Sequence, residues 1–174
     1  MRRIILVVAL VMGFVATAAA QNYAVVDSEK IFKSIEAYNQ ALEQLDELAT
    51  KYQGEVDAKF EKVENLYNAY MQRKATMSQS AQKANEDNII KMEEDATKFQ
   101  ESIFGTEGEL MKKRLELIQP IQKKVFAAIE EYAKQKGYDM IIDVAQNATM
   151  LYYSAKADKT TELIAILKAE DYVR

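Results

Sequence analysis

Adjacent carboxylates are the residues of this sequence whose type and spacing could do acid–base chemistry. Two runs stand out, Glu93-Glu94-Asp95 and Glu130-Glu131, and glycoside hydrolysis uses two carboxyl groups that flank one bond. Neighbouring side chains on a helix, however, point in diverging directions, and no further group completes a catalytic constellation. We therefore do not expect the protein to be an enzyme.

Metal and cofactor chemistry lacks its usual residues. The sequence contains no His and no Cys, which are the commonest transition-metal ligands and, for His, the commonest general base. A calcium site made of carboxylates alone remains open, but no loop has alternating Asp and Asn around a central Gly. Without Cys there is no disulfide framework. We expect neither a metal nor a cofactor.

The first twenty residues predict export from the cytoplasm. Arg2-Arg3 supplies positive charge, residues 4–15 are apolar, and three alanines ending at Ala20 match a signal peptidase site. Cleavage after Ala20 would leave Gln21 as the mature N-terminus. The alternative is a transmembrane anchor, which needs about 20 apolar residues, more than this run provides. We expect a periplasmic protein.

The mature chain is acidic. Removal of the signal peptide takes away two of the 23 basic residues and none of the 27 acidic ones, which leaves a net charge of −6. Affinity for nucleic acid comes mainly from clustered Lys and Arg. The charge therefore argues against a nucleic-acid partner.

Two long helices are predicted between Ser28 and Tyr132. Apolar residues recur there at alternating steps of three and four, as in helices that pack along one seam; Leu42 and Leu117 are among the predicted seam residues. The polar run from Ala75 to Lys83 separates the two striped segments and predicts the tip of a hairpin. Each arm would then be roughly 70 Å long, at 1.5 Å per residue.

Glycine and proline predict soft points in this hairpin. If the turn is centred at the predicted tip, Gly54 lies level with Gly105, and Gly108 follows one turn later. Glycine inside a helix costs about 1 kcal/mol relative to Ala, and proline removes a backbone hydrogen bond. The sequence predicts a hinge at the glycines and a bend at Pro120. The alternative is that the glycines fall level by chance.

The two ends of the mature chain predict a small β-rich base. Three β-prone runs occur at residues 23–26, 140–144 and 149–153, with Gln146-Asn147 as a turn between the last two. Asp27 or Ser28 can cap the first arm, and Gly137 can end the second. Residues 160–169 predict a short amphipathic helix.

The predicted fold class is therefore α+β, a long antiparallel coiled-coil hairpin that projects from a small β-sheet base formed by both chain ends. The predicted ranges are 1–20 for the signal peptide, 21–35 and 120–174 for the base, and 36–119 for the arm. So small a base usually needs disulfides, metals or self-association, and we expect an oligomer assembled through it. The predicted core and interface residues are Val25, Val26, Ile141, Ile142, Leu151 and Tyr153.

The order of these pieces resembles the Skp/OmpH-like family of periplasmic chaperones. The matching segments are Tyr23–Phe32, Lys136–Asp143, Met150–Tyr153 and Asp158–Leu163, with the long hairpin between the first two. The resemblance implies a homotrimer whose helical arms enclose a cavity. It also implies an ATP-independent holdase that binds unfolded outer-membrane proteins before insertion, and it leaves open a membrane lipid or lipopolysaccharide surface as a further partner. Absence of a GxxxxGK[ST] loop agrees with ATP independence.

A holdase needs many weak, non-directional contacts, and aromatic and Met side chains provide them. Apolar residues beside the seam are the best candidates for contact with a client. The predicted contact residues are Leu66, Met71, Ile90, Phe104, Met111 and Leu115. These residues could also simply widen the packed face, and a structural coiled-coil scaffold of the cell envelope remains the alternative function.

Overall fold

The computed structural model describes residues 22–146 and 149–169. The predicted signal peptide, with its cleavage point after Ala20, lies outside these residues, as does Asn147 of the predicted turn. The chain forms two compact units, an arm unit of residues Glu36–Lys123 and a base unit described at residues 22–35 and 124–169. Within the described ranges, no helix combines the length and the apolar character that crossing a bilayer requires.

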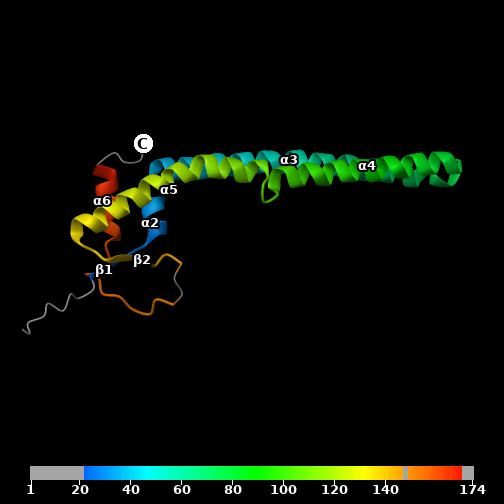
Figure 1. Cartoon of the computed structure of the whole chain (residues 1–174). Helices are drawn as coiled ribbons and strands as arrows, with labels where there is room; N and C mark the ends of the chain where they lie inside the picture. The colour runs from blue at the N-terminus through cyan, green and yellow to red at the C-terminus, as the bar shows by residue number, and fades with distance from the viewer. Residues whose placement is uncertain (1–21, 147–148, 170–174) are drawn as a thin grey trace, which may run out of the picture. The chain divides into compact units, whose positions relative to one another are not determined.

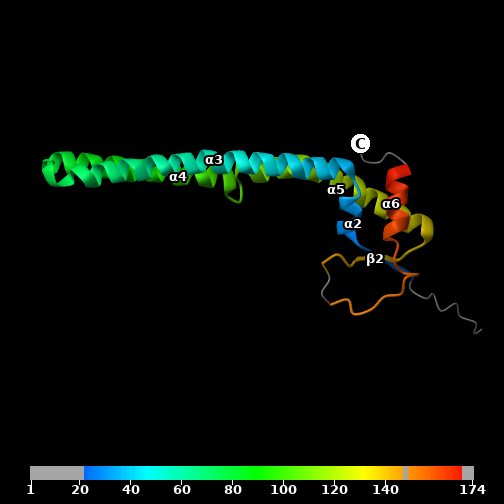
Figure 2. The ribbon, with the colours of Figure 1, turned by 180° about the vertical axis from the view of Figure 1, so that it is seen from behind.

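The arm unit is the predicted helical hairpin. Its first helix is α3 (Glu36–Arg73), and η1 (Lys74–Thr76) leads into α4 (Gln79–Phe104); the first part of α5 (Glu109–Lys136) completes the unit. α3 lies alongside α4 and then α5 in both views (Figures 1 and 2). Its 38 residues span about 57 Å at 1.5 Å per residue.

The tip of the hairpin lies within the predicted run and is held by side chains. The hydroxyl of Ser78 caps α4 by accepting a hydrogen bond from the Ala81 amide at 3.3 Å. The Gln82 side-chain amide donates to the Lys74 carbonyl at 3.0 Å. The Tyr70 hydroxyl donates across the hairpin to Glu86. These local bonds explain why the chain reverses here.

The seam between the helices is closed by small and β-branched residues as well as by Tyr70. Ala41 is buried beside the exposed Leu42, and Ile118 is buried beside the half-buried Leu117. At both positions the buried face includes a residue that the predicted seam left out. The buried side chains of the arm unit are Ala41, Val56, Tyr70, Ile89, Ala96, Ile103, Ile118 and Ile121.

The second arm is interrupted, contrary to the continuous helix that the sequence predicted. α4 ends at Phe104, α5 begins at Glu109, and the loop between them stands out from the arm in Figures 1 and 2. The Gly108 amide donates to the Gly105 carbonyl at 2.9 Å. A Cβ at Gly108 would lie 2.4 Å from the Ile103 carbonyl oxygen. The loop is therefore a compact structure that requires glycine.

A second interruption separates α2 (Ser28–Lys33) from α3. Asp27 caps α2, because its carboxylate accepts a hydrogen bond from the Lys30 amide at 3.0 Å, and this confirms one of the two predicted caps. The Ser34 hydroxyl donates to the Ile31 carbonyl at 2.7 Å, and this bond helps to end the helix. Serine competes in this way with the regular backbone pattern.

The base unit is built on a two-stranded parallel sheet. β1 (Tyr23–Val26) pairs with β2 (Met140–Asp143), with Tyr23 opposite Met140. On its other side β1 meets residues 157–159, where the Val25 amide donates to the Ala157 carbonyl at 2.9 Å. β1 is thus covered on both edges by later parts of the chain.

Side-chain hydrogen bonds tie the chain ends together around this sheet. The amide and the hydroxyl of Ser28 both donate to Asp143, at 3.0 and 2.5 Å. The Asp27 amide donates to the hydroxyl of Thr160, the first residue of α6 (Thr160–Ala169), at 2.9 Å. α6 has the predicted bounds.

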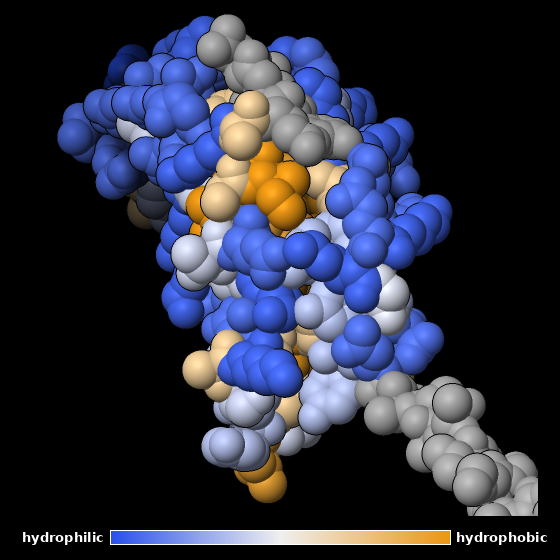
Figure 3. All heavy atoms as spheres, turned by 90° about the vertical axis from the view of Figure 1, so that its left-hand side faces the viewer, coloured by the Kyte–Doolittle hydropathy of each residue, from blue (hydrophilic) through white to orange (hydrophobic). Residues whose placement is uncertain are grey.

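On the face seen in Figure 3, an apolar patch lies among mostly hydrophilic side chains.

The core of the base unit combines residues from both ends of the chain. Its buried apolar residues are Ala24, Val25, Val26, Ile31, Ile35, Val125, Ala128, Tyr132, Leu163 and Leu167. α5 ends at Gly137, whose φ of +68° confirms the predicted C-cap. Pro120 lies inside α5 and is exposed.

The predicted third strand at residues 149–153 was wrong. These residues form no strand within the described chain, and Leu151 is 94% exposed. β-propensity measures how well a residue fits a half-buried pleated surface, and both edges of β1 are already occupied. The run therefore does not pair with β1, and Leu151 and Tyr152 within it are exposed.

Candidate functional site

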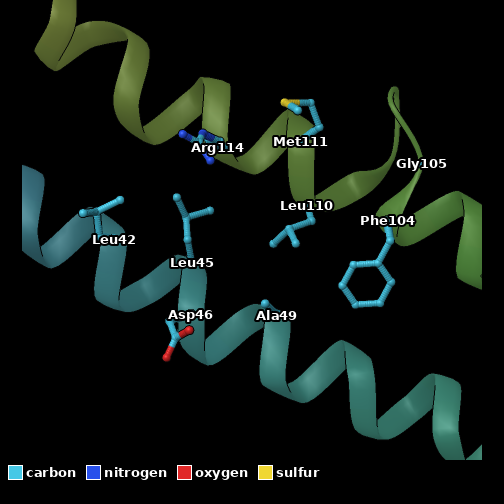
Figure 4. Close-up of a pocket in the computed structure, with 9 residues that line it drawn as sticks. All are labelled: Leu42, Leu45, Asp46, Ala49, Phe104, Gly105, Leu110, Met111 and Arg114. Carbon is cyan, nitrogen blue, oxygen red and sulfur yellow. The ribbon is translucent and has the colours of Figure 1, made fainter. Parts of the chain in front are cut away.

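The arm unit contains an apolar hollow of about 340 Å³ between α3 and the junction of α4 with α5. Three helices contribute to it (Figure 4). The lining residues are Leu42, Leu45, Asp46, Ala49, Phe104, Gly105, Leu110, Met111 and Arg114.

The loop between α4 and α5 explains why a hollow exists at this place. Residues 105–108 leave the helical path, so one turn of helix that would cover α3 is missing. In Figure 4, Leu45 and Leu110 point toward one another from opposite helices, and the Phe104 ring is turned toward α3. Phe104 is 38% exposed and Met111 is 42% exposed. Apolar surface is therefore left open to solvent along the seam.

Charges of opposite sign flank this hollow on its two sides. α3 carries exposed Glu43, Asp46 and Glu47, whereas α5 carries Lys112-Lys113-Arg114 directly after an acidic first turn with Glu109. The Lys113 ammonium pairs with Glu116 at 2.9 Å, and this pairing raises the pKa of Lys113. Asp46 borders the hollow rather than filling it, since its carboxylate is turned to the outer side of α3 in Figure 4.

Neither lining charge has a partner among the described residues. No ion pair or hydrogen bond of the Asp46 carboxylate or the Arg114 guanidinium is formed within residues 22–146 and 149–169. Arg114, which lines the hollow, is therefore available to interact with a bound molecule.

Of the six residues predicted to contact a client, the structure brings two together in the hollow. Phe104 and Met111 line it, beside Gly105. Ile90 borders a separate depression on α4 with Glu93, Glu94, Thr97, Lys98 and Glu101. Of the remaining three, Met71 and Leu115 are exposed and Leu66 is half-buried.

The sequence reasoning missed the α3 side of the hollow. Leu42, Leu45 and Ala49 follow the spacing of a seam, and nothing in that spacing shows which seam positions lack a partner. Gly105 and Gly108 carried the available signal, because two glycines three residues apart can end a helix as well as bend it.

The predicted interface residues of the base fall into two groups. Val25 and Val26 are buried, and Ile141 and Ile142 are half-buried. Leu151 and Tyr153 are exposed, as is Tyr152 between them. A role of these residues in self-association stays a prediction.

The two runs of adjacent carboxylates lie on different helices, α4 and α5. Glu93, Glu94 and Asp95 are exposed on α4. Glu130 pairs with Lys134 at 2.5 Å, which lowers the pKa of Glu130. Within the described residues, no group of three acidic, His or Cys side chains could hold a metal ion. The arrangement supports binding through apolar surface and charge.

Comparison with known proteins agrees with this architecture. A model of the family described as "Outer membrane protein (OmpH-like)" matches residues 22–167. The chain belongs to the OmpH-like family. The family resemblance inferred from short motifs is thereby confirmed.

The OmpH-like fold is also found among solved structures. A crystal structure from Caulobacter crescentus CB15, described as an OmpH-like outer membrane chaperone, matches with a TM-score of 0.65 and 12% sequence identity. The match covers 88% of this chain and 87% of the other. No curated protein sequence matches this OmpH-like chain.

Proposed function

We propose that this OmpH-like protein is a periplasmic holdase chaperone that binds unfolded outer-membrane proteins and prevents their aggregation before insertion, without ATP. The observation that carries the proposal is the incompletely closed seam of the arm. A long hairpin exposes apolar side chains at a hollow and on its outer faces. A rod that served only as a spacer would gain stability by closing that seam.

The physical basis of binding is burial of apolar surface, which contributes about 25 cal/mol per Å² removed from water. An unfolded client has no fixed shape, so contacts must be numerous and tolerant of geometry. Met71, Met111 and Phe104 suit this role, because thioether and aromatic groups adapt to irregular surfaces. Leu66, Ile90 and Leu115 extend the same contact surface along the arm.

Self-association through the base is part of the proposal. The outer edge of β2 and the exposed segment 149–153 are both unused by the described chain, and an unpaired edge is a template for strand addition. We propose that Leu151 and Tyr153, together with Ile141 and Ile142, pack against a neighbouring copy. A homotrimer would place three arms around one cavity, and the family resemblance favours that number.

Hinge motion of the arm belongs to the same proposal. Gly54 lies exposed within α3 and its missing Cβ faces open space, while Gly105 and Gly108 shape the loop of the second arm. Pro120 removes one backbone hydrogen bond from α5. Flexible arms would admit clients of different size.

Aggregation of a urea-unfolded β-barrel protein after dilution tests the function. Light scattering is expected to fall to baseline at about one oligomer per client, whereas a structural scaffold of the envelope would leave it unchanged. Replacing Phe104 and Met111 with Ser should weaken suppression, and replacing exposed Gln100 and Gln119 on the same helices with Ser is the matched control. Circular dichroism checks that all variants keep their helices. Unaltered suppression by the Phe104 and Met111 variant would show that these contacts are misassigned.

A further inference from the structure

We propose that the hollow at the junction of α4 and α5 is an anchor site for one large apolar side chain of an extended polypeptide. The inference rests on the proposed chaperone function and specifies what the arm recognises. It assigns the hollow a defined occupant, an aromatic or long aliphatic side chain with the backbone on either side of it.

The size of the hollow fits one side chain and part of its backbone. An apolar cavity of about 150 Å³ is large enough to bind benzene, and this hollow measures about 340 Å³. A helix with its side chains is about 10 Å across and would not enter. Leu45, Ala49 and Leu110 provide an apolar floor without a polar group that needs a partner.

The two charged rims favour a polypeptide over a lipid. An extended chain directs N–H donors and C=O acceptors to both of its sides, so the guanidinium of Arg114, which lines the hollow, can donate to its carbonyls. An anionic lipid would gain from Lys112 and Arg114 but would be repelled by Glu43 and Asp46. Backbone recognition of this kind tolerates many sequences.

Strands of outer-membrane barrels supply such side chains regularly. They alternate apolar and polar residues, so an unfolded strand presents an apolar side chain every two residues, about 6.6 Å apart. One residue of each strand could enter the hollow while its polar neighbours stay in water. The anchor would therefore hold strands at many registers.

The loop that opens the hollow has a defined structure, which backbone hydrogen bonds hold in place. The Gly105 amide donates to the Glu101 carbonyl at 2.8 Å, and the Lys112 amide donates to the Gly108 carbonyl at 3.1 Å. A Cβ at Gly105 would lie 2.4 Å from the Glu101 carbonyl oxygen. The loop that opens the hollow is thus closely packed on both flanking helices.

Tryptophan fluorescence gives a direct test, because the protein contains no Trp. The probe is an eleven-residue peptide that alternates Ser and Thr with Ala, has one Trp at its centre, and carries one Lys and one Glu. Its emission should shift to the blue when it binds the full oligomer. Ala49→Phe, which fills the hollow, should raise the apparent Kd about tenfold or more. Ala58→Phe, at an exposed position of α3 outside the hollow, should bind as the wild type does.

Two further measurements separate the possible failures. Arg114→Glu leaves the apolar lining intact and should weaken peptide binding a few-fold through the rim, so it provides a second variant if Ala49→Phe alters the helix content. Phosphatidylglycerol vesicles should not displace the peptide, and full displacement would identify the occupant as lipid and overturn the proposal. Equal peptide binding by Ala49→Phe and wild type, with aggregation suppression intact, overturns the anchor and leaves the chaperone function standing. Absence of aggregation suppression by the wild type overturns the chaperone function itself.

Discussion

Alanine at Gly54 should raise the stability of the protein, whereas alanine at Gly105 or Gly108 should lower it. Gly54 lies inside α3, is exposed, and has nothing within 4 Å of the position that a Cβ would take. Alanine there removes backbone freedom from the unfolded chain and adds no contact to break. Gly54→Ala should therefore stabilise the protein by about 1 kcal/mol.

Gly108 presents the opposite case. A Cβ at this position would meet the Ile103 carbonyl oxygen at 2.4 Å, its carbon at 2.7 Å, and the Gly105 nitrogen at 2.9 Å. All three atoms belong to the backbone, so the loop itself must shift to admit a methyl group. Such overpacking costs about 1–3 kcal/mol. Gly105→Ala should also destabilise, through its contact with the Glu101 carbonyl oxygen.

Thermal unfolding followed by circular dichroism measures these effects. For a chain of this length, 1 kcal/mol corresponds to a change in Tm of about 2–4 °C, so Gly54→Ala should unfold higher and Gly108→Ala lower than the wild type. All variants must be compared at one protein concentration, because self-association raises apparent stability. A lower Tm for Gly54→Ala, or equal Tm values for the two variants, would refute the reasoning.

Spin-label distances across the hairpin test the proposed hinge with the same variants. If Gly54 is a soft point, Gly54→Ala should narrow the distribution of distances between labels on the two arms. An unchanged distribution would remove Gly54 from the hinge. Gly108→Ala is not a test of stiffness, because it alters the loop.

Four further substitutions probe the base unit. Leu163 has no exposed surface, so Leu163→Ala should lower the free energy of unfolding by about 2–5 kcal/mol. Leu151→Ala should leave the stability of the protomer unchanged and raise the dissociation constant of the proposed oligomer, measured by mass photometry. Burial, with Glu162 nearby, raises the pKa of Tyr132. The stability that the protonated hydroxyl contributes is present below about pH 10 and is lost as the pH rises further. Tyr132→Phe should therefore reduce the fall of Tm at alkaline pH. Burial alone would raise the pKa of Asp143, but hydrogen bonds from Ser28 and from the Ala145 amide outweigh it and lower that pKa. The stability that the charged carboxylate contributes is present above about pH 4, so the Tm deficit of Asp143→Asn should shrink below that pH.

The sequence predicts the features of this fold that arise from local chemistry. The polar run at residues 75–83 lacks the apolar stripe of the two arms, and the chain reverses there. Asp27 caps α2, Gly137 ends α5, and α6 has its predicted bounds. Each of these depends on residues within one or two turns of each other.

Features that depend on distant partners were predicted less well. Residues 149–153 have strand composition, but the edges of β1 are taken by β2 and by residues 157–159. Leu42 has seam spacing, but it borders the hollow and is left partly exposed. The sequence indicates which structure a residue favours, but only the fold shows which residues it packs against.

Of the two sides of the hollow, the sequence predicted the one formed by α4 and α5. Phe104 and Met111 were recognised as apolar residues beside the seam, and both line the hollow. The α3 residues opposite them were assigned to the seam, because a break in one helix is not visible in the spacing of its partner. The break itself depends on backbone contacts at Gly105 and Gly108.

The pairing of β1 with β2 sets an order of events in the life of each chain. These strands lie more than a hundred residues apart, as the bond between Asn22 and Asp139 illustrates with a separation of 117 residues. Closing so long a flexible loop costs about 4 kcal/mol, whereas the Tyr70–Glu86 contact at the tip spans 16 residues. The hairpin should therefore form first and shorten the loop that the sheet must close. The N-terminal strand therefore has to wait for the last quarter of its own chain. In the proposed secreted oligomer, no protomer could complete its base before β2 and α6 had emerged from the translocation channel.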